Sequence, residues 1–242
     1  MGFFNAKNKG VTLVELSIVL AIFGILIVVG ISGRSLIDIS RATATTEYLS
    51  NRSIAFQTFT STYDCVPGDC ATPTVVGSTG QLNTVGVGNG NITIESLATN
   101  NEIPFVEEHF VKAQLFNRSI GTITAGTNPN LVSILPMSKV PGAYVSSVSI
   151  AGNIYNVLGG ASTTETLING TAIAYPNLFR IIDSKIDDSS ATTGNARCET
   201  TFATTGFSGT TAYNAMTSGC VFAVKIWLCW LTTIIHFTLV VL

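Results

Sequence analysis

The chain has 242 residues, of which 46% are hydrophobic and 11% are charged, and its formal net charge is −2. This balance excludes the basic excess of a nucleic-acid-binding domain and the acidic tail of a disordered interaction segment. We therefore expect no nucleic-acid partner for the domain itself.

The first predicted element is an apolar run over residues 11–31. It follows Lys7, Lys9 and Gly10, and its single charged residue is Glu15. Its 21 residues are enough to cross a bilayer, since about 20 residues in a helix span the hydrocarbon. A carboxylate inside such a segment costs about 2.5–3.5 kcal/mol on insertion scales. Glu15 is therefore expected to be functional.

Three interpretations of this N-terminal region compete. A secretory signal peptide has an apolar stretch of roughly 7–15 residues before a small-residue cleavage site. Here the run is longer, and Ile31-Ser32-Gly33 is a poor cleavage site. A plain membrane anchor explains the length but leaves Glu15 unexplained. Cleavage after Gly10 retains the apolar segment in the mature protein and accounts for the arrangement of all these features.

Gly10-Val11-Thr12-Leu13-Val14-Glu15 resembles the prepilin signature of type IV pilins and type II secretion pseudopilins. The resemblance implies that a prepilin peptidase cleaves after Gly10 and that the new amine of Val11 is methylated. The first mature residue is usually phenylalanine in that family, so Val11 departs from the pattern.

The same resemblance implies a location and a set of partners. The chain would be held in the bacterial inner membrane by a single pass, surrounded by membrane lipid, with its globular domain in the periplasm. An inner-membrane assembly platform would then add it to other pilin or pseudopilin subunits in a helical filament. Glu15 could pair there with the Val11 amine of a neighbour; alternatively, Glu15 lies at headgroup depth beside Lys9.

Residues 34–63 predict a continuation of the helix. They contain neither proline nor glycine, and their apolar residues approximate one helical face. We expect the charged residues to lie on the other faces: Arg34, Asp38, Arg41, Glu47 and Arg52. The organisation predicted so far is a leader at 1–10, a transmembrane helix at 11–33 and an amphipathic helix at 34–63.

The helix is expected to end near Tyr63, before a turn at Pro67-Gly68. Cys65 and Cys70 bracket that turn, so a small disulfide loop between them is geometrically easy. The segment from Tyr63 to Asp69, with its Pro-Gly-Asp sequence, also resembles one found in a subset of large pilin-like proteins.

Residues 64–227 are expected to form a globular, β-rich domain. A helix is predicted within 95–118, with Pro104 in its first turn, and Ala151-Gly152-Asn153 predicts a hairpin turn. The β-prone runs are 119–124, 131–135, 143–150, 153–158 and 220–227. The predicted fold class is α+β, with a long N-terminal helix packed on a C-terminal antiparallel sheet.

Three aspartates follow a short amphipathic helix that is predicted to begin at Pro176. Asp183, Asp187 and Asp188 are candidate calcium ligands, because calcium takes six to eight oxygens and some pseudopilins bind calcium in C-terminal loops. The alternative is a capped helix end with solvated acids and a contact from Asp187 to Lys185 or from Asp183 to Arg197. No other cofactor is expected.

Cys198 and Cys220 bracket a stretch rich in threonine and glycine. The pilin resemblance implies a disulfide-closed C-terminal region of this kind, which stabilises by about 3 kcal/mol in the entropic account. Four paired cysteines suit an oxidising compartment, and Cys229 is expected to be free. Residues 228–242 are an apolar tail that could be a second membrane segment, additional strands or a misread C-terminus.

Catalysis has little support, because the sequence contains no serine-nucleophile motif, P-loop or metal-ligand cluster of the catalytic kinds. Two functions remain. The first is a structural filament subunit of a type IV pilus or type II secretion pseudopilus, and the chain's large size favours a minor one. The alternative is a membrane-tethered or filament-tip protein that binds a ligand, as an adhesin or in DNA uptake.

Overall fold

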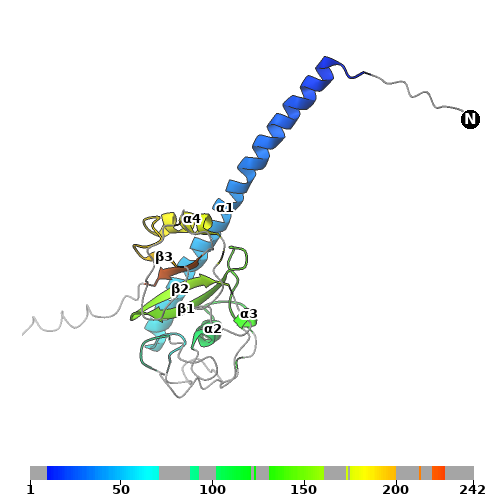
Figure 1. Ribbon diagram of the computed structural model, residues 1–242. Coiled ribbons are helices and arrows are strands. Elements are labelled where there is room, and N and C mark those ends of the chain that lie inside the picture. Colours follow the sequence, from blue (N-terminus) through cyan, green and yellow to red (C-terminus); the bar gives the residue numbers. More distant parts are fainter. Residues whose placement is uncertain are drawn as a thin grey trace, which may run out of the picture. The chain divides into compact units, whose positions relative to one another are not determined.

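The computed structural model describes residues 10–70, 88–92, 102–120, 123, 131–160, 173, 175–199, 213 and 220–226. Its elements in chain order are α1 (Leu13–Tyr63), α2 (Ile103–Lys112), α3 (Leu131–Ile134), β1 (Tyr144–Ile150), β2 (Asn153–Gly159), α4 (Pro176–Ile186), β3 (Ala196–Glu199) and β4 (Val221–Lys225) (Figure 1). A long N-terminal helix followed by an antiparallel sheet confirms the predicted α+β class. The apolar tail, with Cys229, lies outside the described residues.

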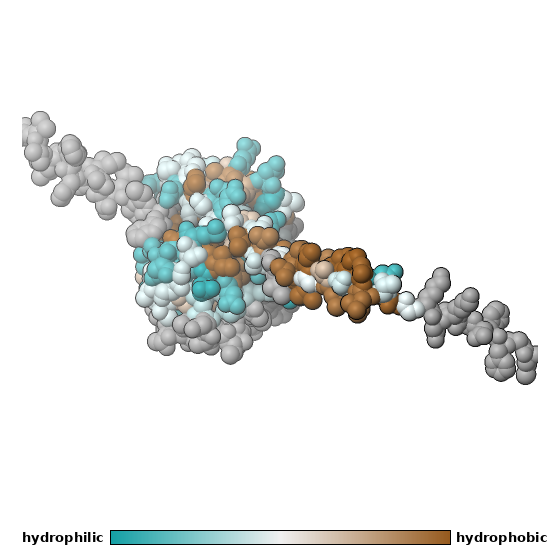
Figure 2. All heavy atoms as spheres, turned by 90° about the horizontal axis from the view of Figure 1, so that it is seen from above, coloured by the Kyte–Doolittle hydropathy of each residue, from teal (hydrophilic) through white to brown (hydrophobic). Residues whose placement is uncertain are grey.

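The chain forms two compact units, Met1–Ser40 and Arg41–Leu242. In the first unit, the described large apolar residues of α1 are exposed all round the helix, and Figure 2 shows hydrophobic side chains gathered along this part of it. Among the described residues, α1 is the one helix long and apolar enough to cross a membrane. A helix that is apolar on every face needs lipid or other helices around it.

In the second unit, the last part of α1 buries one narrow stripe. The stripe recurs every three or four residues at Ala42, Thr45, Leu49, Arg52, Phe56 and Phe59, and Ala55 is buried beside Phe56. The amphipathic prediction thus holds for Leu49, Phe56 and Phe59, but it is wrong for Ile37, which is 52% exposed, and for Arg52. The Arg52 side chain lies in the middle of the buried stripe because it finds acidic and polar partners on other elements.

The sheet has the order β1-β2-β4-β3, and every neighbouring pair is antiparallel. The predicted hairpin joins β1 to β2 through a two-residue turn in which Ala151 and Gly152 have φ values of 49° and 75°. Positive φ at both positions is the geometry that matches strand twist in tight hairpins. The Asn153 side-chain amide donates to the Ala151 carbonyl oxygen at 3.3 Å and supports the turn.

The predicted strand over residues 131–135 is wrong, because Leu131–Ile134 is a single helical turn. The Leu135 amide donates to the Leu131 carbonyl at 2.8 Å, and Leu131, Ile134 and Leu135 are buried together. Their spacing is the helical one, and it outweighs the β-prone composition of the run. Residues 119, 120 and 123 of the predicted 119–124 strand are not in a strand either.

The helix predicted within 95–118 is shorter in the structure. It begins at Ile103, with Pro104 in the first turn as expected, and ends at Lys112. Residues 95–101 lie outside the described residues. Two apolar clusters fill the core: Phe56 packs edge-on against Phe110 at 5.0 Å in one, and Phe179 stacks on Phe222 at 5.0 Å in the other.

Candidate functional site

The predicted cleavage position is open. No atom lies within 4 Å of the place where a Cβ would sit on Gly10, and Gly10 has no positive φ that would require glycine. Val11 is 73% exposed. The folded chain itself therefore gives no steric or conformational reason for glycine at this position.

Glu15 caps the start of α1. The Thr12 amide and hydroxyl donate to Glu15 Oε2 at 2.9 and 3.0 Å, and the Glu15 amide donates to the Thr12 hydroxyl at 3.2 Å. This reciprocal arrangement is a capping box, and a carboxylate there also suits the positive end of the helix dipole. Glu15 is exposed, so its other oxygen is open to a partner. The Thr-x-x-Glu spacing of Thr12 and Glu15 is the sequence signal from which this cap could have been predicted.

The Pro67-Gly68-Asp69 turn ties three separate segments together. Cys65 is joined to Cys70 with a Cα–Cα distance of 5.4 Å. Gly68 has a φ of +93°, and a Cβ there would lie 2.7 Å from the Val106 side chain, so only glycine fits. The buried Asp69 carboxylate accepts the backbone amides of residues 88–90. The turn therefore has a structural role, because it holds the end of α1, residues 88–90 and α2 together.

His109 holds the same turn from α2. Its Nδ1 accepts the Gly68 amide at 2.9 Å, and its ring stacks on Phe59 with centroids 5.4 Å apart. Burial, followed by the nearby Lys112 charge, lowers the pKa of His109 to about 4. The imidazole is therefore neutral in the folded protein at neutral pH, as an acceptor must be.

We expect His109 to make the folded protein sensitive to acid. The unfolded chain takes up a proton below about pH 6.5, while the folded protein stays neutral to about pH 4. The stability that depends on neutral His109 is complete above pH 6.5 and falls as the pH drops towards 4, by about 2 kcal/mol between pH 7 and 5. Urea unfolding of the full chain in detergent at the two pH values measures this loss. The free energy of unfolding of His109→Gln should fall less between pH 7 and 5 than that of the wild type, whatever its value at pH 7. An equal loss in both proteins would show that other groups cause it.

The three candidate calcium ligands come together at the C-terminal end of α4. One oxygen of each of Asp183, Asp187 and Asp188 lies within 4.8 Å of the others. Asp183 is fully buried and accepts the Tyr213 hydroxyl at 2.9 Å, so the solvated-acid alternative is wrong for this residue. Burial raises the pKa of Asp183 to about 6; the Tyr213 hydrogen bond opposes that rise, and the charges of Asp188 and Asp187 add to it.

The outer two aspartates also shape the loop that follows α4. Asp187 accepts the Asn195 amide, and Gly194 has a φ of +75°, a conformation that favours glycine and that brings it against the Asp187 carboxylate. Asp188 accepts the Ser190 amide at 2.9 Å and the Thr193 hydroxyl at 2.6 Å. Asp183 Oδ1, in contrast, is buried and accepts no hydrogen bond of normal geometry from the described residues.

The second pair of cysteines joins the two neighbouring strands at one side of the sheet. Cys198 of β3 and Cys220, which directly precedes β4, are both fully buried and are linked with a Cα–Cα distance of 5.6 Å. Cys220 also exchanges backbone hydrogen bonds with Ile173. The sequence did not predict β3, which has only four residues, but the pilin resemblance implied that a disulfide closes this region.

Comparison with known proteins supports the N-terminal interpretation. Residues 5–31 match the family model of the prokaryotic N-terminal methylation motif, which is the signature of type IV pilins and pseudopilins and confirms the resemblance. This motif family is structural rather than catalytic, and the motif together with the apolar helix fits a membrane-anchored pilin. No curated protein and no solved structure matches the chain.

Proposed function

We propose that the chain is a minor subunit of a type IV pilus or type II secretion pseudopilus, with a structural and non-enzymatic role. A prepilin peptidase removes residues 1–10, the Val11 amine is methylated, and α1 holds the subunit in the inner membrane with its domain in the periplasm. The assembly platform then transfers it into a filament. The methylation motif over residues 5–31 is the observation that carries this proposal.

The geometry at the start of α1 supports a mechanism by which such a subunit could join a filament. Cleavage after Gly10 creates a positive amine on Val11. Glu15 is held by Thr12 through one oxygen and exposes the other. A neighbour's amine and this carboxylate neutralise each other when helices pack together, whereas either charge alone is costly in an apolar surrounding. The pair thereby sets the axial register between subunits.

The alternative function, a ligand-binding protein, would confine the chain to the filament tip, whereas a minor structural subunit would also lie along the shaft, and immunogold labelling of intact filaments distinguishes the two. Quantitative mass spectrometry of sheared, purified filaments measures the number of copies per filament. We expect the mature chain in these filaments at a few copies among many copies of a major subunit. Presence only in the membrane fraction of cells that make filaments would contradict a filament role of either kind.

The aspartate cluster of α4 supports a calcium site as part of this proposal. Calcium prefers oxygen ligands and takes six to eight of them, mainly from carboxylates. Three carboxylates converge here, and the buried Asp183 Oδ1 lacks a normal hydrogen bond within the described residues. Asp183, Asp187 and Asp188 would hold the ion, which would neutralise their mutual repulsion and stabilise the loop between α4 and β3.

Calcium should raise the thermal stability of the full chain if this site exists. A ligand at 100 times its dissociation constant stabilises the folded state by about 2.7 kcal/mol. Thermal unfolding at neutral pH in 10 mM calcium, compared with the same sample in chelator, measures the effect. Asp183→Asn should abolish the shift, and the exposed control Asp64→Asn should retain it. An unchanged melting temperature for the wild type would rule out the site.

A further inference from the structure

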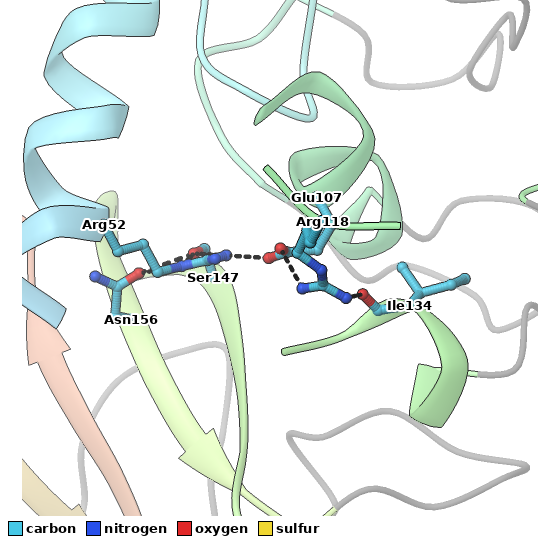
Figure 3. Close-up of polar contacts among 6 residues, drawn as sticks. All are labelled: Arg52, Glu107, Arg118, Ile134, Ser147 and Asn156. Atoms are coloured by element: carbon cyan, nitrogen blue, oxygen red, sulfur yellow. Dashed lines mark hydrogen bonds and ion pairs between the residues drawn. The ribbon is translucent and has the colours of Figure 1, made fainter. Parts of the chain in front are cut away.

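Arg52 is the one charged member of the stripe that α1 buries against the domain. Its side chain is fully buried and reaches three elements at once (Figure 3). Nε donates to Ser147 Oγ of β1 at 3.1 Å and to Asn156 Oδ1 of β2 at 2.9 Å. Nη2 donates to Ser147 Oγ at 2.9 Å and forms an ion pair with Glu107 of α2.

The network continues from Glu107 to a second arginine. Glu107 is also buried, and its other oxygen accepts Arg118 Nη1 at 3.2 Å. Arg118 in turn donates to the carbonyl of Ile134 in α3. Arg118 is 23% exposed, so one end of the network reaches water. Five side chains and one carbonyl therefore connect α1, the sheet, α2 and α3 (Figure 3).

Such a network is poor evidence for stability. The free energy cost of removing two charges from water is about as large as the gain from their attraction. Replacing a buried ion pair with well-packed apolar side chains often leaves stability unchanged or raises it. Burial by itself lowers the pKa of Arg52, while Glu107 and Tyr48 raise it above its ordinary value, so the guanidinium stays charged. Its planar fork makes directional bonds that an apolar side chain cannot replace.

The apolar residues of the stripe make no directional contacts of this kind. Residues 42, 49 and 56 and residues 45, 52 and 59 each repeat with a spacing of seven, so a slip of two helical turns would place Leu49 where Phe56 packs. Apolar contact is non-directional and opposes such a slip weakly. A single polar residue in an apolar seam is the best attested means of specifying one register, at a cost in stability.

We propose that Arg52 is a positioning residue that fixes the axial and rotational setting of residues 41–63 of α1 on the sheet, and that filament assembly depends on this setting. The inference rests on the proposed filament function. A helical filament needs every subunit to present the same domain surface relative to the helix that packs with its neighbours. Arg52, held by Ser147, Asn156 and Glu107, provides that uniformity.

The test is to replace the ion pair with apolar side chains of similar length. Arg52→Met with Glu107→Leu leaves no unpaired buried charge, because Arg118 reaches solvent. We expect the full chain in detergent to keep its melting temperature within a few degrees of the wild type. We also expect the yield of sheared filaments, relative to membrane content, to fall at least tenfold. A wild-type filament yield from the folded double variant would overturn the proposal.

Two further variants make the outcome decisive. Phe179→Leu lies in the other core cluster and should lower the melting temperature by several degrees while filament yield is retained. If the double variant does not fold, Arg52→Lys is the deciding variant. It keeps the positive charge but cannot contact Ser147, Asn156 and Glu107 together, so its filament yield should also fall. Normal assembly of Arg52→Lys would overturn the proposal. Failure of the proposed filament function would be distinguishable from failure of this proposal, because the wild-type chain would then be absent from filaments.

Discussion

Glu15→Ala should remove the chain from filaments while leaving its membrane content unchanged. Loss of a charge eases insertion into the bilayer, and cleavage after Gly10 should proceed. In the filament, however, the neighbour's Val11 amine would be buried without its partner. Breaking a buried pair in this way costs about 3–5 kcal/mol, which corresponds to more than a hundredfold in an association constant, since 1.4 kcal/mol is about tenfold.

The capping box adds a second, smaller effect that must be separated from the first. Loss of a capping interaction costs about 0.5–2 kcal/mol, so the buried amine dominates. Glu15→Gln keeps a side-chain oxygen for the Thr12 amide but loses the charge, and it should assemble nearly as poorly as Glu15→Ala. Thr12→Val removes the capping hydroxyl but keeps the carboxylate, and its effect should be mild. The readout is the yield of sheared filaments beside total membrane content. Wild-type yield from Glu15→Ala would show that the carboxylate is only interfacial.

Gly10→Val should reduce processing from nearly complete to nearly absent. A Cβ at this position would meet no atom within 4 Å in the folded chain, so folding and insertion should be unaffected. The defect therefore lies at the peptidase, which needs a minimal side chain on the residue that precedes the cut. Gly33→Ala is the matched control, because it too lies in open surroundings, and it should be processed normally.

Electrophoretic separation of precursor from mature chain, followed by N-terminal sequencing, measures this result. The mature wild type should begin at Val11. A mature chain that begins after Gly33, or normal maturation of Gly10→Val, would indicate a conventional signal peptide in place of the prepilin interpretation.

Features governed by local chemistry were predictable from the sequence. The extent of α1 follows from an uninterrupted helical pattern that stops before Pro67-Gly68, and the structure ends the helix at Tyr63. The β1–β2 hairpin follows from two β-prone runs around Ala151-Gly152, and its register places Ile150 opposite Asn153. In both cases the residues that decide the structure are neighbours in the chain, so pattern and turn chemistry are sufficient.

Features governed by distant partners were not predictable in the same way. Arg52 is buried because Glu107, 55 residues away, neutralises it, and Asp183 is buried beside Tyr213, 30 residues away. A charge pattern along the chain suggests solvent for both, because it does not reveal where such partners fold. The short strand β3 owes its existence to pairing with β4, and its Ala-Arg-Cys-Glu sequence has little β preference of its own.

The identity of the chain as a processed, methylated filament subunit is tested most directly by the intact mass of the protein recovered from sheared filaments. The expected mass is that of the chain without residues 1–10, plus one methyl group, less the hydrogens lost in the Cys65–Cys70 and Cys198–Cys220 disulfides. Reduction should restore those hydrogens and leave the methyl group in place. A mass that retains residues 1–10, or that lacks the apolar segment before Gly33, would contradict the account.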